Sequence, residues 1–250
     1  MTLIVTVICN QGIIQASDSH LTYPSGRVES GPKVFKLGFA DGVLALAGAY
    51  HVGAKTMDRW LPDLISSYSS SAGPTLRGFA NHLAVELECS PTSSAGRIFH
   101  ISGYVSDASG VHPEFYFVRN FHGIDAMTGD YEPATSEYQV TEDFWTRDYL
   151  RAPEGTFATG GYQRYFNGTP PGRIAYFGAV QKLQEFYAQV WGESDWKFRK
   201  PVSLDELAAF VRLELETISA LYMSSDYPSP YIGGEIQIVK IPAPSEAITL

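Results

Sequence analysis

Thr2, Asp18, Lys33 and Gly48 are the residues near the start of the chain whose types and spacing could carry out hydrolysis. Thr2 directly follows Met1, so removal of Met1 would leave a hydroxyl and a free α-amine on the same residue. A hydroxyl is a poor nucleophile until a base takes its proton. An α-amine has a reference pKa of about 7.7–8.0, which suits a general base near neutral pH. Thr2 could therefore supply both the nucleophile and the base.

Taken one at a time, these residues have ordinary explanations. A threonine at position 2 commonly does no more than permit removal of methionine, and Asp18 ends an apolar run as a turn residue does. Most lysines are solvated, and a glycine such as Gly48 often marks the exit from a strand. Their combined order is more specific, because Asp18 follows Thr2 by sixteen residues and Lys33 and Gly48 each follow after another fifteen.

This order resembles the proteasome β-subunit family, which belongs to the N-terminal-nucleophile hydrolases. The resemblance covers residues 2–53 and includes Lys33 before the aliphatic-aromatic pair Val34-Phe35. It returns more weakly at residues 158–161 and 232–239. It implies an α+β fold arranged as a four-layer αββα sandwich. It also implies a threonine-type endopeptidase without a cofactor, which acts on peptide or unfolded protein substrates inside a homo-oligomeric ring.

The resemblance also implies a role for each residue of the proposed site. Thr2 would be the nucleophile, and the charge of Lys33 would lower the pKa of the nucleophilic centre. Asp18 would pair with Lys33 and orient it. The backbone N–H of Gly48 would stabilise the oxyanion of the tetrahedral intermediate. Lys36 is a rival to Lys33, but it does not precede the aliphatic-aromatic pair, so Lys33 is preferred.

Two further positions complete the implied site. Thr159 stands where the family has a serine near the amine of the nucleophile, so a hydroxyl is kept. Asp226, with Ser229 near it, is the candidate for a second family aspartate. Asp226 precedes Gly233 by more residues than the family pattern has, so this sequence departs from that pattern.

The substrate pocket is expected to follow Asp18 and to surround Gly48. On the resemblance, its lining residues are Leu21, Thr22, Leu46 and Tyr50, and Thr22 would also bind the substrate backbone. An apolar pocket of this kind predicts a preference for apolar peptide side chains.

Hydrophobic periodicity gives the expected order of elements. Strands are grouped and helices are paired, which excludes a doubly wound parallel sheet because its elements would alternate. The first two strands are apolar at nearly every position, so both of their faces need cover. Two stacked sheets with helices outside each would provide it, in agreement with the implied αββα sandwich. The expected strands are 2–9, 13–18, 34–37, 43–47, 97–105, 114–119, 156–159 and 235–241.

Four helices are expected among these strands. The first spans about 52–68, with a kink or a new start at Pro62. The second has Pro74 in its first turn and an apolar face that runs from Leu76 to Leu87. The third spans 173–191. The fourth begins at a capping box formed by Ser203 and Glu206.

The 250 residues are interpreted as a single domain, 1–250. Residues 120–155 form an acidic, aromatic insertion, which is either a solvated surface segment or an element for ring contact or partner docking. The tail at 242–250 is expected to be loose.

The composition restricts the classes of partner and the location. The net charge of −9 argues against nucleic acid and anionic membrane as partners. No apolar run is long enough for a membrane span and no secretion signal is evident, so a cytoplasmic protein is expected. The two cysteines and six histidines show no metal-ligand spacing. Nothing in the sequence indicates whether an ATPase unfoldase is a partner.

Two other functions are compatible with the same residues. One is an N-terminal-nucleophile amidohydrolase that acts on a small amide, although such relatives often begin with cysteine or serine rather than with a residue like Thr2. The other is a non-catalytic subunit that builds a ring. A scaffold would have no need of Thr2, Asp18 and Lys33, so a peptidase is preferred.

Overall fold

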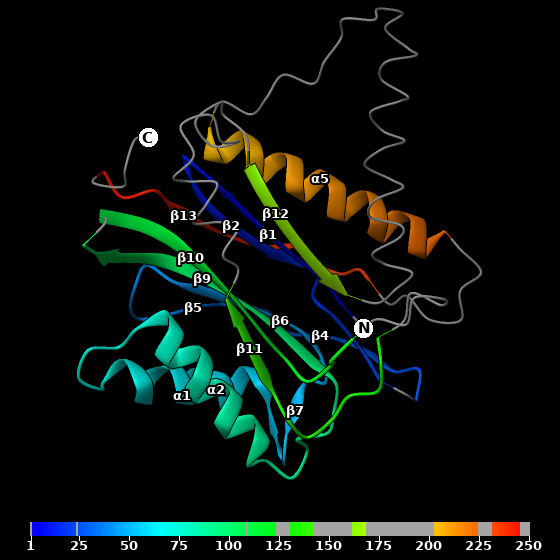
Figure 1. The fold of residues 1–250 in the computed structure, drawn as a ribbon. Helices are drawn as coiled ribbons and strands as arrows, with labels where there is room; N and C mark the ends of the chain where they lie inside the picture. Colours follow the sequence, from blue (N-terminus) through cyan, green and yellow to red (C-terminus); the bar gives the residue numbers. More distant parts are fainter. Residues whose placement is uncertain are drawn as a thin grey trace, which may run out of the picture.

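The computed structural model describes residues 2–23, 25–108, 110–123, 131–142, 162–168, 203–224 and 232–245. Within these residues the chain folds as an α+β protein with antiparallel sheets and three helices (Figure 1). The α+β class expected from the grouped strands and helices is therefore confirmed. The strand expected at 156–159 and the helix expected at 173–191 lie outside the described residues.

The first sheet has the strand order β12-β1-β2-β13. Every residue of β1 and β2 is buried, as predicted from their unbroken apolar runs. The expected strands 2–9, 13–18 and 235–241 are confirmed to within two residues, whereas β12 was not predicted. The strands of this sheet are Leu3–Cys9 (β1), Gly12–Ser17 (β2), Tyr162–Gly168 (β12) and Gln237–Pro242 (β13).

The second sheet has the strand order β11-β10-β9-β6-β5. Its four expected strands are confirmed, and β11 is an addition that falls inside the acidic stretch 120–155. Part of that stretch therefore completes the sheet by pairing with β10. The strands are Val34–Lys36 (β5), Val43–Gly48 (β6), Arg97–Asp107 (β9), Gly110–Arg119 (β10) and Gln139–Glu142 (β11).

Two short hairpins lie beside the sheets. One pairs β3 (His20–Thr22) with β4 (Val28–Ser30), and the other pairs β7 (His51–Val52) with β8 (Lys55–Thr56). The second hairpin overturns the helix start expected near residue 52. Its turn places Gly53 at φ +58°, a left-handed conformation that glycine adopts without steric cost and that a helix cannot contain.

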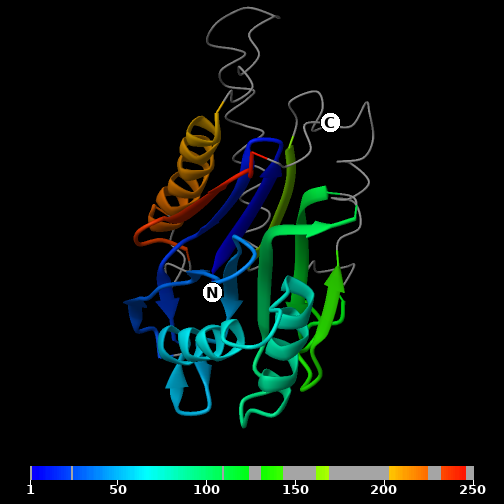
Figure 2. The ribbon, with the colours of Figure 1, turned by 90° about the vertical axis from the view of Figure 1, so that its left-hand side faces the viewer.

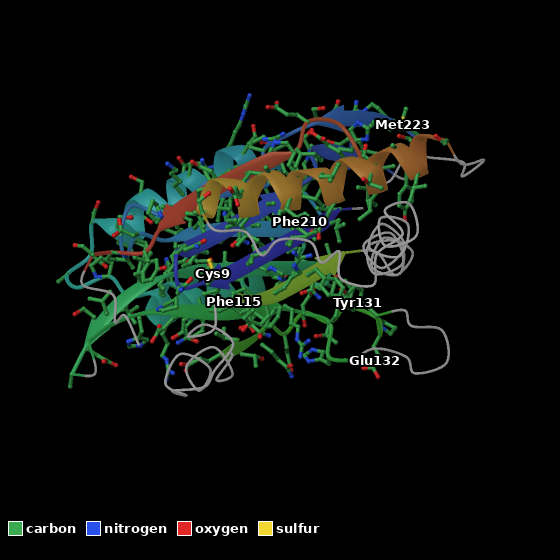
Figure 3. All side chains as sticks on the ribbon, turned by 90° about the horizontal axis from the view of Figure 1, so that it is seen from above. Cys9, Phe115, Tyr131, Glu132, Phe210 and Met223 are labelled. Atoms are coloured by element: carbon green, nitrogen blue, oxygen red, sulfur yellow. The ribbon has the colours of Figure 1, made fainter. Side chains whose placement is uncertain are left out.

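The helices cover the outer faces of the two sheets (Figures 1 and 2). Helices α1 (Met57–Ser69) and α2 (Leu76–Glu88) lie against the second sheet, where α2 contacts β9, β10 and β11. Helix α5 (Leu204–Met223) contacts β2 and β13 of the first sheet. Seen from above in Figure 3, α5 crosses the first sheet with Phe210 and Met223 along its length.

The helix ends correct two expectations and confirm a third. Helix α1 continues through Pro62, so the alternative of a new helix at that residue is wrong. Pro74 lies before α2 rather than in its first turn, because the Oγ1 of Thr75 caps the helix by accepting from the Gly78 N–H at 3.1 Å. The cap expected for the last helix is confirmed, since the Ser203 Oγ accepts from the Glu206 N–H at 3.2 Å.

Two large apolar clusters hold these layers together. The first lies between the two sheets and continues under α5, and the second lies between the second sheet and helices α1 and α2. Phe115 of β10 stacks on Tyr165 of β12 in the first cluster, with ring centroids 4.0 Å apart and planes inclined by 9°. This pair joins the two sheets directly.

The tail is fixed at its beginning. Pro242 ends β13, and the Ala243 N–H donates to the Gln11 carbonyl oxygen at 3.0 Å, so the expected loose tail begins later than residue 242. Residues 246–250 lie outside the described part of the chain. Helices in the described ranges are too short or too polar to cross a membrane.

Candidate active site

The β1–β2 hairpin brings the start of the chain beside Asp18. Ile4 pairs with Ser17 in the antiparallel register, so Leu3 and Asp18 meet where the two strands end. The Leu3 N–H donates to the Asp18 Oδ1 at 3.0 Å. Thr2, which is 4% exposed, therefore directly precedes the residue whose N–H binds the Asp18 carboxylate.

The Asp18 carboxylate is completely buried and accepts from donors on several segments. Its Oδ2 accepts from Lys33 Nζ at 3.1 Å, from the His20 N–H at 3.2 Å and from the Gly233 N–H at 3.3 Å. A buried carboxylate is costly unless it is paired and hydrogen-bonded. Here the pairing draws Lys33 and the chain just before β13 to the end of the hairpin.

Lys33 is 1% exposed, and its ammonium also donates to the carbonyl oxygen of His20. Burial lowers the pKa of Lys33, and the charge of Asp18 opposes that effect. The rival Lys36 is exposed at the end of β5. Of the two lysines, the structure thus places Lys33 at Asp18.

Gln237 of β13 fixes the backbone around Lys33. Its Oε1 accepts from the Lys33 N–H at 2.7 Å, and its Nε2 donates to the Gly31 carbonyl oxygen at 3.1 Å. Both halves of the amide are therefore satisfied by one short segment. Sequence reasoning missed this residue, because a glutamine in a final strand has no distinguishing spacing.

Gly48 is the last residue of β6. Ile4 packs against Ala45 and Ala47 of β6, and the Leu46 N–H donates to the Lys33 carbonyl oxygen at 3.0 Å. These contacts bring the end of β6 toward the Asp18–Lys33 pair. Gly48 is exposed.

The backbone at Gly48 requires glycine for two reasons. Its φ of +104° lies in a region that other residues rarely adopt. A Cβ at this position would also overlap the carbonyl oxygen of Gly96. The sequence predicted a glycine with a backbone role here, and the structure gives that glycine a steric reason.

Leu21 and Tyr50 line a hollow of about 460 Å³ beside the site. Gly31 and Pro32, which precede Lys33, also line it, and the Tyr50 hydroxyl donates to the Pro32 carbonyl oxygen at 2.9 Å. The hollow is less apolar than the sequence predicted. Its wall also carries the charged residues Glu29, Lys55, Asp58 and Arg59.

Leu46 does not line this hollow. Side chains alternate along β6, so Ala45 and Ala47 face the first sheet and Leu46 faces the helices. Leu46 is 1% exposed within that helix-side cluster. Thr22 lies on β3 and is likewise not among the residues that line the hollow.

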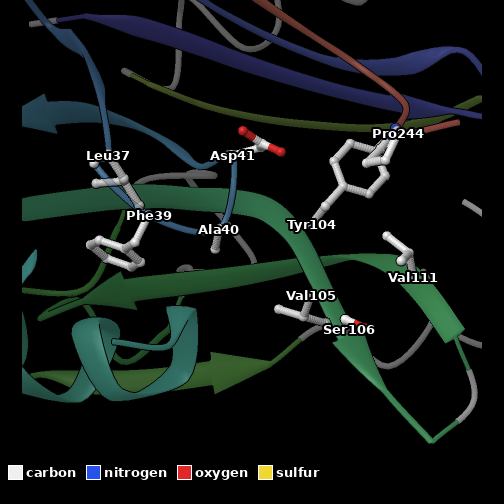
Figure 4. A pocket seen from close by; sticks show the side chains of 10 residues that line it. Leu37, Phe39, Ala40, Asp41, Tyr104, Val105, Ser106, Val111 and Pro244 are labelled. Carbon is white, nitrogen blue, oxygen red and sulfur yellow. The ribbon is translucent and has the colours of Figure 1, made fainter. Parts of the chain in front are cut away.

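A second hollow, of about 520 Å³, lies at the opposite end of β5 and β6 (Figure 4). Leu37, Phe39, Asp41 and Tyr104 contribute to its wall. None of the predicted site residues that the structure describes lines it. Thr159, Asp226 and Ser229 fall outside the described residues, so the structure gives no position for them.

Residues 2–23, 25–108, 110–123 and the later described ranges contain no group of three or more His, Cys, Asp or Glu side chains placed to hold a metal ion. The arrangement at Asp18 can instead hold a positive charge beside the start of β1. A scan against models of known protein families finds no match to this chain. A search of curated proteins also finds no match.

Proposed function

We propose that the chain is a threonine-type N-terminal-nucleophile peptidase of the proteasome β-subunit type. The observation that carries this proposal is the buried Lys33–Asp18 pair, held beside the amide that follows Thr2. A lysine ammonium is rarely buried without a function for its charge. Here the ammonium is paired with the carboxylate that accepts from the Leu3 N–H, one residue after Thr2.

The proposed mechanism begins after removal of Met1. The Thr2 hydroxyl oxygen attacks the carbonyl carbon of the peptide bond, and its proton passes to the free α-amine. The C–N bond then breaks, and the protonated amine gives its proton to the leaving nitrogen. Water, deprotonated by the same amine, cleaves the resulting ester, releases the acid product and restores the threonine hydroxyl.

The surrounding residues have supporting roles in this mechanism. The ammonium of Lys33 favours the anionic form of the Thr2 oxygen, and Asp18 keeps the ammonium in place. The Gly48 N–H would donate to the developing oxyanion, where such a donor is worth about 3–4 kcal/mol. Thr159, near the amine of Thr2, and Asp226, as the second family aspartate, remain predictions.

We further propose that the two stacked sheets and their outer helices belong to the four-layer αββα sandwich of this hydrolase class. Helix α5 would then be one member of the pair outside the first sheet. The resemblance also implies a homo-oligomeric ring, which predicts a native mass that is a multiple of 27.5 kDa. A monomeric mass at micromolar protein would contradict the ring but not the chemistry.

The test is the intact mass of the purified protein, with and without an inhibitor that reacts covalently with N-terminal threonine. Loss of Met1 together with an adduct on Thr2 is the expected result. Thr2→Ala should abolish both the adduct and peptide cleavage, whereas Thr2→Ser should retain both because it keeps a hydroxyl. Retention of Met1 in every molecule would rule out the peptidase, since the α-amine would be part of a peptide bond.

Substrate class needs a separate measurement. A panel of fluorogenic peptides and small amides would compare apolar, acidic and basic side chains at the cleaved position. We expect cleavage of peptides with apolar side chains, which would contact Leu21 and Tyr50 in the hollow. A preference for charged side chains would contradict this specificity, and activity confined to small amides would favour the amidohydrolase alternative.

A further inference from the structure

Arg97 is a completely buried arginine at the first position of β9, directly opposite Gly48 in the strand register. Arg97 has no role in the mechanism proposed above. Burial of a guanidinium is costly unless every donor finds a partner. The described residues offer it no carboxylate within ion-pair distance, so neutral oxygen atoms must satisfy the charge.

The guanidinium contacts the turn that follows Gly48. Its Nε donates to the Ala49 carbonyl oxygen at 3.2 Å, and its Nη2 donates to the carbonyl oxygen of His51. The Ala49 N–H in turn donates to the Gly96 carbonyl oxygen at 2.8 Å. Ala49 is therefore held through both its N–H and its C=O, immediately after the proposed oxyanion donor.

The other side of the guanidinium contacts a different part of the chain. Its Nη1 donates to the Thr92 carbonyl oxygen at 2.8 Å, to the Ala95 carbonyl oxygen at 3.2 Å and to the Tyr138 hydroxyl at 2.9 Å. Its Nη2 also donates to the Thr92 Oγ1 at 3.0 Å. One planar group thus joins the Gly48 turn to the segment before β9 and to the segment before β11.

Asn120, which directly follows β10, contributes to the same hydrogen-bonded frame. This frame consists of Arg97, Asn120 and the groups to which they donate. The Asn120 Oδ1 accepts from the Arg97 N–H at 2.8 Å, and its Nδ2 donates to the carbonyl oxygens of Ser93, Ala95 and Thr135 at 2.8–3.0 Å. The acceptors around Arg97 are therefore themselves fixed. Because the guanidinium presents its donors in a rigid fork, its position determines where the Ala49 and His51 carbonyl groups lie.

We infer that Arg97 is the positioning residue for the oxyanion donor, holding the Gly48–His51 turn in the geometry that catalysis requires. This inference rests on the proposed function. It also assigns a role to part of the acidic stretch, since the Tyr138 hydroxyl accepts from the guanidinium and the Thr135 carbonyl oxygen accepts from Asn120. Tyr50 lies in the same turn, but its hydroxyl is held separately by Pro32.

Arg97→Lys is the principal test, because lysine keeps the charge and the aliphatic stem but cannot reach both sides of the frame. We expect kcat to fall about 10- to 100-fold, approaching the loss of one oxyanion donor, while KM changes by less than about threefold. Hydrogen exchange in a peptide that spans residues 48–52 should become faster, while exchange in β1 and β2 stays as in the wild type.

Tyr138→Phe provides a milder variant in case Arg97→Lys folds poorly. It removes one acceptor of the guanidinium and should lower kcat in the same direction by about three- to tenfold. Arg77→Lys is the matched control, since Arg77 is an exposed arginine that pairs with Glu142 outside this frame. It should leave both kcat and the exchange of residues 48–52 unchanged.

The two possible failures can be told apart. An active wild type whose Arg97→Lys variant has unchanged kcat and unchanged exchange at 48–52 would overturn the inference. A loss of activity that matches the unfolded fraction of the sample would overturn it as well. A wild type without peptidase activity would overturn the proposed function, and the exchange measurement would still decide whether Arg97 holds the turn.

Discussion

At the scale of single residues, the Asp18 carboxylate accepts hydrogen bonds from several donors among the described residues. The Leu3 and Gly233 amides and the Lys33 ammonium come from three segments of the chain, and each donates to the carboxylate. A neutral side chain of the same shape cannot replace it, because an amide would turn an N–H₂ group toward at least one of these donors. Asp18 therefore joins three segments of the chain as well as balancing the charge of Lys33.

Asp18→Asn should lower the free energy of unfolding by about 3–5 kcal/mol, since it leaves the Lys33 ammonium buried without its partner. Denaturant unfolding followed by circular dichroism would measure this change. Asp63→Asn is the matched control, because the Lys55–Asp63 pair is well exposed and should contribute less than about 1 kcal/mol. Equal effects of the two substitutions would contradict the stabilising role of the buried pair.

His100 gives a pH-dependent prediction. It is completely buried between Thr6, whose Oγ1 lies 2.8 Å from Nδ1, and Asn167, whose Oδ1 lies 2.7 Å from Nε2. Burial lowers the pKa of His100 from 6.5 to about 4. As the pH falls, the unfolded chain binds the proton first, so stability is complete above pH 6.5 and is lost between pH 6.5 and 4.

The loss at His100 should amount to about 3 kcal/mol over this range. The unfolding free energy of the wild type should therefore fall more steeply between pH 6.5 and 4 than that of His100→Gln. His82→Gln, at a partly exposed histidine of α2, is the control for the loss of a histidine elsewhere in the fold. Identical slopes in all three proteins would show that His100 is not held neutral by the fold.

At the scale of elements, β13 connects the end of the chain to the site near its beginning. It pairs with β2, so Gln237 lies opposite Ser17 and reaches the backbone around Lys33. The strand thus has two functions, because it extends the first sheet and it holds the segment that carries the lysine.

Gln237→Leu should destabilise the protein by about 1–3 kcal/mol, since it leaves the Lys33 N–H and the Gly31 carbonyl oxygen without partners. Lys240→Gln tests the same strand at an exposed position, where its pairing with Asp205 should contribute less than about 1 kcal/mol. Thermal unfolding of both variants would make the comparison. A Gln237→Leu protein as stable as Lys240→Gln would mean that the two amide hydrogen bonds do not matter.

The sequence predicted elements best where one rule of periodicity applied throughout. The wholly apolar β1 and β2 and the stripe of α2 are examples, as is the cap at Ser203. Strand β12 was missed because its polar residues are partly buried: Arg164 pairs with Glu214, and Asn167 with His100. These partners lie far from β12 in the sequence, so the local pattern of residues does not predict the contacts.

Some contacts of the candidate site could be predicted from the sequence and others could not. The pairing of Asp18 with Lys33 followed from a resemblance over the first fifty residues, and the structure places the two side chains together. Gln237 could not be predicted, because its partner Lys33 is 204 residues away and the contact depends on strand order. Leu46 lies in the helix-side cluster, because side chains alternate along β6 and its own points away from the first sheet.

At the scale of the whole molecule, the two sheets share one core. The cluster between them contains residues of β1 and β2 together with Phe115 of β10, and the Phe115–Tyr165 stack crosses from one sheet to the other. Neither sheet can expose its inner face without exposing that of the other. The sheets should therefore lose their structure together.

Phe115→Ala should lower the free energy of unfolding by about 3–5 kcal/mol. Both sheets should be destabilised by the same amount. Hydrogen exchange in β1 and in β9 would report the two sheets separately. Val85→Ala, at an apolar residue of α2 that is 54% exposed, is the control and should have an effect within about 0.5 kcal/mol. Loosening of β9 alone would show that the sheets are energetically independent.

The strand order of the first sheet has a consequence for synthesis on the ribosome. The hairpin made first, β1–β2, occupies the centre of that sheet, and both of its neighbours come from the second half of the chain. Gly233 and Gln237, which hold Asp18 and the Lys33 segment, are translated more than two hundred residues after Thr2. A nascent chain therefore carries Thr2 long before it can form the contacts around Asp18 and Lys33, and contacts so distant in sequence form slowly. If the chain is a peptidase, its activity is delayed by its own topology until β13 has been translated.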